Sequence, residues 1–195
     1  MRRICVFAGS NSGVRQEYRE AARALGQELL ARGLGLVYGG GSVGLMGVLA
    51  DAVLAGGGEV IGIIPRGLLR REVAHGGLTE LHEVASMHER KALMSDLADG
   101  FIALPGGFGT FDELFEIITW AQLGLHNKPV GLLDVADYFA PLHALVVHAS
   151  AEGFIPPAHL AILMQEHSPG ILLDRFAAYT PPGSVSRWTE LPPEP

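Results

Sequence analysis

The sequence predicts a doubly wound α/β fold, in which helices cover both faces of one parallel sheet. Short apolar runs alternate along the chain with segments whose apolar residues recur at helical spacing. The apolar runs lack polar alternation, as is typical of strands buried on both faces. Glycine accounts for 26 of the 195 residues and gathers where the apolar runs end, and that edge of such a sheet is where ligands bind.

The first half of the chain contains a regular alternation of strands and helices. In order, the pattern predicts strand 4–8, helix 15–32, strand 34–38, helix 45–54, strand 60–64, a short strand around Val84 and helix 88–97. Gly33 ends the first helix and Pro65 closes the third strand. The stretch 66–80 has no clean periodicity, so we expect a long loop there.

The second half continues the same alternation. The pattern predicts strand 100–104, helix 111–123, strand 129–133, helix 138–149, strand 161–164 and helix 171–178. Ser168-Pro169 has the order of a cap followed by proline that is typical of a helix start. Residues 180–195 carry five prolines and are expected to form a loose tail. The length fits one domain, which we place at residues 1–179.

Composition excludes several classes of protein. Apolar residues make up 48% of the chain and charged residues 18%, which is a globular composition and not a disordered one. The formal net charge of -7 argues against a nucleic-acid partner, which requires a basic surface. No apolar run is long enough to span a membrane, and the first is too short for a signal peptide. We expect a cytoplasmic protein whose single cysteine, Cys5, is a buried and inert thiol.

Glycine-rich turns follow three of the predicted strands, at 9–13, 39–41 and 105–110. Glycine allows a ligand to approach the backbone closely, and the start of the next helix offers unpaired N–H groups that suit phosphate. The alternative is that these are tight turns alone. None of the three has the spacing of a P-loop or of the dinucleotide-binding fingerprint. The turns therefore favour a mononucleotide or sugar phosphate over NAD binding or ATP hydrolysis.

Charged residues flank the third glycine-rich turn on both sides. Arg90 and Lys91 are adjacent on a predicted helix, so their side chains leave it in different directions. Glu113, Glu116 and Thr119 form one polar ridge along an otherwise apolar helix. A carboxylate buried on such a helix needs a partner, and we expect Arg90 to be the partner of Glu116. The alternative is a solvated helix start.

The sequence does not predict a metal site or a bound cofactor. The eight histidines are scattered without metal-ligand spacing. Ser10 and Ser12 lack the GxSxG context of a serine hydrolase.

Several motifs resemble one known family. Residues 105–113 fit the pattern PGGxGTxxE, and residues 87–91 fit the MHxRK segment that precedes it. The segments 7–10, 37–41, 119–124 and 127–133 also fit. Over roughly residues 3–178 the chain resembles the Lonely Guy (LOG) family of cytokinin-activating proteins.

The resemblance implies a Rossmann-like homodimer whose catalytic domain, residues 1–179, binds a nucleotide. It also implies a phosphoribohydrolase that cleaves the N-glycosidic bond of N6-substituted adenosine 5′-monophosphates, with AMP as a further candidate substrate. Arg90 and Glu113 match the family positions with catalytic roles. The candidate substrate-binding residues are Ser10, Gly40, Gly41, Glu72, Met87, Lys91, Gly107, Phe108, Gly109, Thr110, Phe111, Asp112, Glu116 and Thr119.

The chemistry of such a cleavage assigns roles to these residues. Breaking a ribosyl C–N bond builds positive charge on the sugar, so Glu113 is assigned to the ribose and the attacking water. Arg90 orients the reacting groups, and the amides of residues 107–110 hold the 5′-phosphate. Two alternatives stay open: a non-catalytic nucleotide carrier or sensor, and a plain AMP nucleosidase. The label "lysine decarboxylase", carried by many such sequences, lacks support because only Lys91 and Lys128 are available for a Schiff base.

Overall fold

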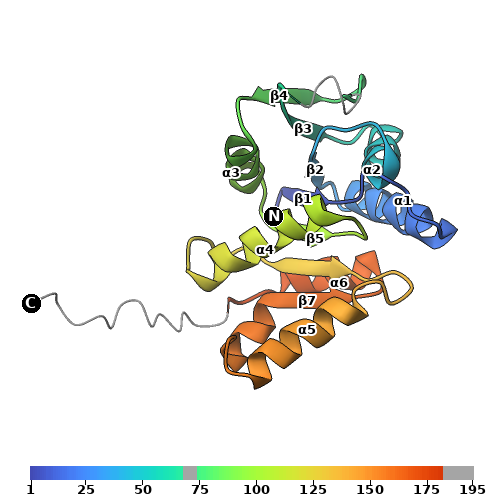
Figure 1. The fold of residues 1–195 in the computed structure, drawn as a ribbon. Coiled ribbons are helices and arrows are strands. Elements are labelled where there is room, and N and C mark those ends of the chain that lie inside the picture. The colour runs from blue at the N-terminus through green and yellow to red at the C-terminus, as the bar shows by residue number, and fades with distance from the viewer. Residues whose placement is uncertain (68–73, 182–195) are drawn as a thin grey trace, which may run out of the picture.

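The computed structural model describes residues 1–67 and 74–181 and shows a seven-stranded, fully parallel sheet (Figure 1). The strand order is β4-β3-β2-β1-β5-β6-β7, so β1 is central. The strands are β1 (Arg3–Phe7), β2 (Gly35–Tyr38), β3 (Val60–Pro65), β4 (Glu80–Val84), β5 (Gly100–Ala103), β6 (Val130–Leu133) and β7 (Leu163–Glu166). The predicted α/β fold is confirmed.

The described residues also form six α-helices and one 3₁₀ helix, of which α6 follows the last strand. They are α1 (Gln16–Ala31), α2 (Gly44–Leu54), α3 (Met87–Leu97), α4 (Phe108–Gln122), α5 (Ala140–Ala151), the 3₁₀ helix η1 (Pro157–Ile162) and α6 (Pro169–Ala177). Helices α1, α2 and α6 cover one face of the sheet, where Leu25, Leu49 and Leu172 join one core cluster. Helices α3 and α4 cover the other face, where Met94 and Leu114 join a second cluster. Both faces of the sheet are therefore covered, as predicted.

Several element boundaries differ from the predictions by one to three residues, and three of them have a clear local cause. Helix α4 begins at Phe108, three residues earlier than expected, because the glycines of this turn continue into the first helical turn with Gly107 as the N-cap. The start of α5 moves from 138 to 140, since Ala136 and Asp137 adopt positive φ angles of 54° and 58°. The last strand lies at Leu163–Glu166 because residues 157–162 form the 3₁₀ helix.

The sheet has one topological switch point, between β1 and β5. From β1 the chain builds outward through β2, β3 and β4, then returns to pair β5 with the opposite side of β1. In open α/β sheets ligands bind in the crevice beyond such a point. Here the loops that leave β1 and β5 meet directly, because the Gly9 N–H donates to the Pro105 carbonyl at 3.1 Å.

Cys5 lies on β1 and is fully buried, as predicted. Burial raises the pKa of its thiol well above the ordinary value. The side chain is accordingly an inert core residue. Among the described helices, none has the length and apolar character required to cross a membrane.

Helices α1 and α2 pack closely at Gly26. A Cβ atom at this position would lie 2.8 Å from the Cβ of Ala52 and 3.0 Å from the carbonyl oxygen of Leu49. In an isolated helix, replacing glycine by alanine stabilises the helix by about 1 kcal/mol. Here the overlap reverses the sign, and we expect Gly26→Ala to lower the free energy of unfolding by about 1–3 kcal/mol, as measured by urea denaturation.

Gly170, near the start of α6, provides the matched control. Its added Cβ would have no neighbour closer than Glu28 Oε1 at 3.4 Å. Gly170→Ala should therefore leave the stability unchanged or raise it by up to about 1 kcal/mol. Equal stability of the two variants would contradict the tight α1–α2 contact.

Candidate active site

Two cavities adjoin at the switch point and share Gly9, Ser10 and Gly107. The smaller cavity, about 170 Å³, is also lined by Ala8, Met46, Arg90, Phe108, Gly109, Thr110 and Glu113. The larger cavity, about 290 Å³, is also lined by Asn11, Ser12, Gly13, Tyr18, Leu45, Pro105, Gly106 and Tyr138. The structure thus brings Ser10 and residues 107–110 together with the two candidate catalytic residues around the smaller cavity.

The N-terminus of α4 forms one wall of the smaller cavity. The first amides of a helix have no intrahelical acceptor and carry a partial positive charge. Added Cβ atoms at Gly107 and Gly109 would meet no atom within 4 Å, so this backbone faces open space. Thr110 is buried beside it. This wall suits a phosphate group.

Arg90 reaches the cavity from α3, whose start is fixed by two side-chain hydrogen bonds, of which the second differs from a capping box by going to the residue before the N-cap. The Ser86 hydroxyl accepts a hydrogen bond from the Glu89 N–H at 3.1 Å, and the Glu89 carboxylate accepts one from the Ala85 N–H at 2.7 Å. This reciprocal arrangement fixes the first turn of the helix. The two cations of that turn, Arg90 and Lys91, are thereby held although the helix dipole disfavours them.

The Arg90 guanidinium is buried, but its contacts are long. Its Nη2 atom lies 3.5 Å from Glu113 Oε1 and 3.5 Å from the Gly39 carbonyl oxygen. Its Nε has no hydrogen-bond partner in the part of the chain that the structure describes. A Cβ at Gly39 would lie 2.1 Å from Nη2, so this glycine provides the space for the guanidinium. A buried cation with unused donors has capacity left for a ligand.

Lys91 pairs with the other carboxylates of α4. Its ammonium lies 3.1 Å from Asp112 Oδ2 and 3.0 Å from Glu116 Oε2. Burial lowers the pKa of Lys91, but its hydrogen bonds to Glu116 and Asp112 outweigh burial and raise the pKa. The expectation that Arg90 pairs with Glu116 is therefore wrong. Because Arg90 and Lys91 leave α3 in different directions, Arg90 meets Glu113 and Lys91 meets Glu116, one turn further along α4.

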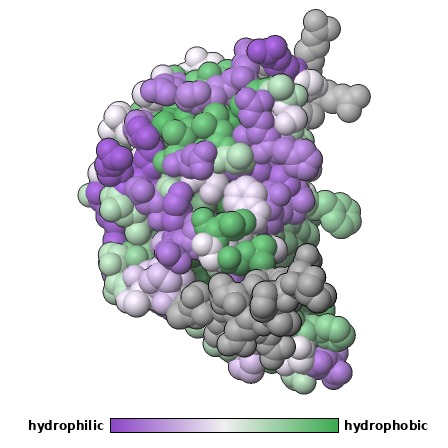
Figure 2. Space-filling view, turned by 90° about the vertical axis from the view of Figure 1, so that its left-hand side faces the viewer, coloured by the Kyte–Doolittle hydropathy of each residue, from purple (hydrophilic) through white to green (hydrophobic). Residues whose placement is uncertain are grey.

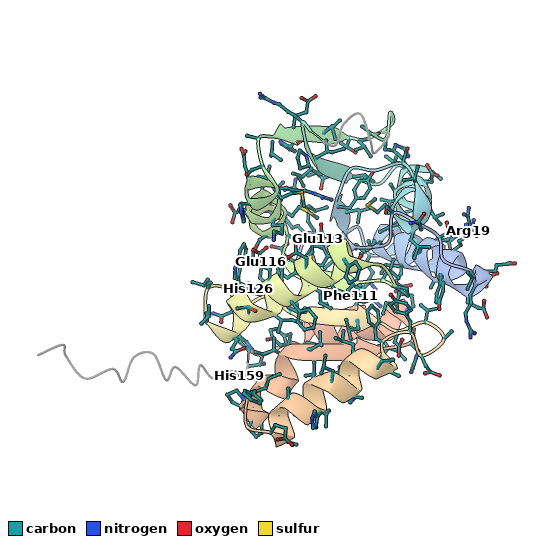
Figure 3. All side chains as sticks on the ribbon, in the orientation of Figure 1. Arg19, Phe111, Glu113, Glu116, His126 and His159 are labelled. Carbon is teal, nitrogen blue, oxygen red and sulfur yellow. The ribbon has the colours of Figure 1, made fainter. Side chains whose placement is uncertain are left out.

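The polar ridge of α4 runs from the cavity to solvent. Glu113 is buried, Glu116 is half-buried and Thr119 is exposed, and both glutamates project from α4 toward α3 (Figure 3). The Thr119 hydroxyl donates to the Phe115 carbonyl oxygen at 2.7 Å. The ridge was recognised in the sequence, but its graded burial depends on how α3 covers the first turns of α4.

The remaining predicted binding residues lie at different distances from the cavity. Phe111 packs against the core cluster on the α4 side of the sheet, whereas Phe108 is 92% exposed at the cavity mouth. The Gly40 carbonyl accepts from the His75 N–H at 3.0 Å, and Gly41 forms a bridge with Ala74. These two glycines therefore contact the segment after β3 and do not line either cavity.

Met87 and Glu72 are the two remaining residues that the sequence predicts for substrate binding. Met87 is partly exposed, and its sulfur lies 3.8 Å from Arg90 Nη1. Glu72 lies outside the described residues.

Sequence reasoning missed several residues of the site, most clearly Gly39 and Tyr138. The Gly39 position was recognised as part of a glycine-rich turn, but not as the space that Arg90 occupies. The Tyr138 hydroxyl donates to the Gly106 carbonyl oxygen. The Tyr138 ring lies edge-on to the Tyr18 ring, with 5.9 Å between the ring centroids. No spacing in the sequence signals this contact, because it joins the loop after β5 to the loop after β6.

One group of candidate metal ligands occurs among the described residues, at the ends of β6 and β7. Ligand atoms of Asp134, Asp137 and His167 lie within 4.8 Å of one another. The buried Asp134 carboxylate already accepts hydrogen bonds from the Phe139 N–H at 2.9 Å and the Gln165 amide at 2.7 Å. These bonds satisfy the buried carboxylate. Asp134 thereby supports the loop before α5.

Comparison with known proteins adds three likenesses. The sequence profile of a family described as "Possible lysine decarboxylase" matches residues 46–176. The Oryza sativa subsp. japonica protein "Probable cytokinin riboside 5'-monophosphate phosphoribohydrolase LOGL9" is 53% identical over 180 residues, 92% of this chain and 79% of that protein. The Arabidopsis thaliana "Cytokinin riboside 5'-monophosphate phosphoribohydrolase LOG1" is 49% identical over 180 residues, 92% of this chain and 84% of that protein.

A structural likeness extends to a protein with a different role. The molybdenum cofactor carrier protein of Chlamydomonas reinhardtii matches with a TM-score of 0.68 over 91% of this chain and 99% of that chain. The sequence identity is 18%, so this likeness concerns the fold alone.

Proposed function

Because the chain belongs to the LOG family, we propose that it is a phosphoribohydrolase acting on N6-substituted adenosine 5′-monophosphates. The products are the free base and ribose 5-phosphate. The observation that carries the proposal is the Arg90–Glu113 pair, whose side chains are 7% and 9% exposed beside the N-terminus of α4. Phosphate binding alone does not require a buried carboxylate at this place.

The phosphate anchors the substrate in this proposal. The amides of residues 107–110 and the Ser10 hydroxyl bind the 5′-phosphate at the start of α4. The ribose then extends along the cavity toward Glu113, which lies one turn into the helix. The binding free energy of the phosphate thereby holds C1′ near the catalytic carboxylate.

The reaction transfers the ribosyl group to water. As the C1′–N9 bond breaks, positive charge develops on the sugar and the Glu113 carboxylate stabilises it. Glu113 also accepts the proton of the attacking water, whose oxygen forms the new bond to C1′. The departing base takes up a proton from solvent at nitrogen, and Glu113 returns the proton of the water to solvent after the cleavage. Arg90 holds Glu113 in place and donates to the ligand with its unused N–H group.

The rival functions differ in what they require of the site. A carrier or sensor would use the same glycine-rich loops without hydrolysis, whereas an AMP nucleosidase would not need the N6 substituent. A pyridoxal-dependent decarboxylase needs a lysine that forms a Schiff base. The chain has two lysines; Lys91 is paired with two carboxylates, and Lys128 donates to the Ser95 carbonyl at 2.7 Å. The carboxylate–arginine set therefore favours the hydrolase.

We further propose a homodimer in the cytoplasm, where nucleoside monophosphates are made and used. Helix α5 is rich in apolar residues yet has none buried, and Leu145 and Val147 are exposed on it. Phe115 on α4 and Leu123 just after it are also exposed. The side of the molecule on which α3 lies also shows apolar side chains among polar ones (Figure 2). Such surfaces mark sites of association.

The first prediction concerns the form of the substrate. If the 5′-phosphate anchors the nucleotide, kcat/KM for isopentenyladenosine monophosphate should exceed that for its nucleoside by at least about 100-fold, since charged hydrogen bonds contribute about 1.5–3 kcal/mol each. Base release is measured by chromatography. AMP tested in parallel shows whether the N6 substituent is required. Equal kcat/KM for nucleotide and nucleoside would contradict the phosphate site.

The second prediction concerns Glu113 and Arg90. Glu113→Gln should lower kcat by about 10²–10³-fold with a smaller effect on KM, because the carboxylate acts as charge builds in the transition state. Arg90→Ala should cost at least as much, since it leaves a buried carboxylate without its arginine. Both variants should remain folded and bind AMP, as measured by circular dichroism and calorimetry.

An exposed carboxylate on α3 provides the control for this series. Asp96→Asn should keep wild-type kcat and KM. If the wild-type protein binds AMP tightly but releases no base from any adenosine monophosphate, the carrier function replaces the hydrolase.

The third prediction concerns assembly. Light scattering at micromolar protein should give twice the mass of the chain, in keeping with a two-fold dimer. Leu145→Asp, on α5, should shift the protein toward the monomer because a charge at an apolar interface is costly. Ile171→Asp, an equally exposed position on α6, should leave the dimer intact. A monomeric wild-type protein would contradict the proposal.

A further inference from the structure

Tyr138 holds a carbonyl of the loop that precedes α4. It lies between β6 and α5, and its hydroxyl donates a hydrogen bond to the Gly106 carbonyl oxygen. Its ring packs edge-on against Tyr18 at 5.9 Å and against Phe139 at 5.0 Å. The ring is therefore fixed by its neighbours, and the hydroxyl has a defined direction.

The geometry of the peptide unit transmits this contact to the cavity. The Gly106 C=O and the Gly107 N–H belong to one planar trans peptide and point in opposite directions. Tyr138 lines the larger cavity, whereas Gly107 lines both. With the carbonyl bonded on the side of Tyr138, the Gly107 N–H is directed away from the larger cavity, toward the side on which Arg90 and Glu113 lie.

The preceding carbonyl is held in a similar way. The Pro105 oxygen accepts from the Gly9 N–H at 3.1 Å. Two consecutive carbonyls before α4 are thus bonded to donors outside their own loop. A carbonyl oxygen turned into the cavity would repel an anion, so these two bonds keep the wall next to α4 rich in N–H donors.

We propose that Tyr138 is a positioning residue for the substrate phosphate, acting through the Gly106–Gly107 peptide. The inference rests on the proposed function, because it assumes that a 5′-phosphate binds at the start of α4. Tyr138 does not touch the reacting atoms in this role. Its hydroxyl fixes one donor of the phosphate site, and its ring serves only to hold the hydroxyl.

The phenylalanine variant separates these two contributions. Tyr138→Phe keeps the ring contacts with Tyr18 and Phe139 and removes the bond to Gly106. Losing the orientation of one donor to a charged group should raise KM for the monophosphate about tenfold. Because this contact is made equally in the ground and transition states, kcat should change by less than about twofold.

The decisive readout is the ratio of kcat/KM for isopentenyladenosine monophosphate to kcat/KM for its nucleoside. This ratio does not depend on the fraction of folded enzyme, so a general loss of structure leaves it unchanged. Tyr138→Phe should lower it about tenfold. Tyr179→Phe, a tyrosine after α6 that lines neither cavity, should keep the wild-type ratio. A wild-type ratio in Tyr138→Phe overturns the inference.

Failure of the proposed function gives a different pattern. In that case the wild-type protein itself releases no base from any monophosphate. The affinity for AMP, measured by calorimetry, then replaces the kinetic ratio. About tenfold weaker AMP binding by Tyr138→Phe than by Tyr179→Phe supports the positioning role, and equal binding overturns it.

Discussion

The pairing of β1 with β5 is the contact on which the rest of the site depends. These strands are separated by almost 100 residues and pair in register from Ile4↔Gly100 to Phe7↔Ala103. Their pairing brings two glycine-rich loops to one edge, where a Cβ on Gly9 would lie 3.3 Å from the Cα of Gly106. The close approach leaves no room for side chains between the loops. Backbone groups therefore form the floor of the cavity.

The three ion pairs that Arg90 and Lys91 of α3 make with α4 differ in burial. Lys91 makes two contacts of about 3 Å with carboxylates, one of which, Asp112, has a side chain that is 60% exposed. An exposed pair such as the one with Asp112 contributes little to stability, and both contacts link α3 to α4. Arg90 and Glu113 lie 3.5 Å apart in a buried setting, where removing one partner is costly. The longer pair, Arg90–Glu113, is thus the one whose arginine has more to gain from hydrogen bonds to a ligand.

Much of the fold and part of the site could be predicted from local signals. Apolar runs and helical spacing predicted each strand and each α-helix, but not the 3₁₀ helix η1. Glycine-rich turns predicted the edge of the sheet at which the two cavities lie. The partner of Glu116 could not be predicted, since it depends on which of two adjacent cations on α3 meets which turn of α4. Gly39 and Tyr138 were missed for the same reason, because their contacts join loops that only the assembled sheet brings together. The start of α4 was misplaced because glycines that favour a loop also occur in the first turn of a helix whose N-terminus faces a ligand.

The same fold serves a molybdenum cofactor carrier, so the fold by itself does not decide between carrying and cleaving. The start of α4 offers donors to an anion. Cleavage also needs a group whose interaction strengthens as the glycosidic bond breaks. We propose that Glu113 meets this requirement, because a carboxylate beside the ribose gains attraction only when the sugar becomes positive. The Glu113 side chain is 9% exposed, and the low dielectric of such a place strengthens that attraction further. In the function that we propose, cleavage on this scaffold depends on one buried carboxylate, Glu113, and on the arginine that holds it.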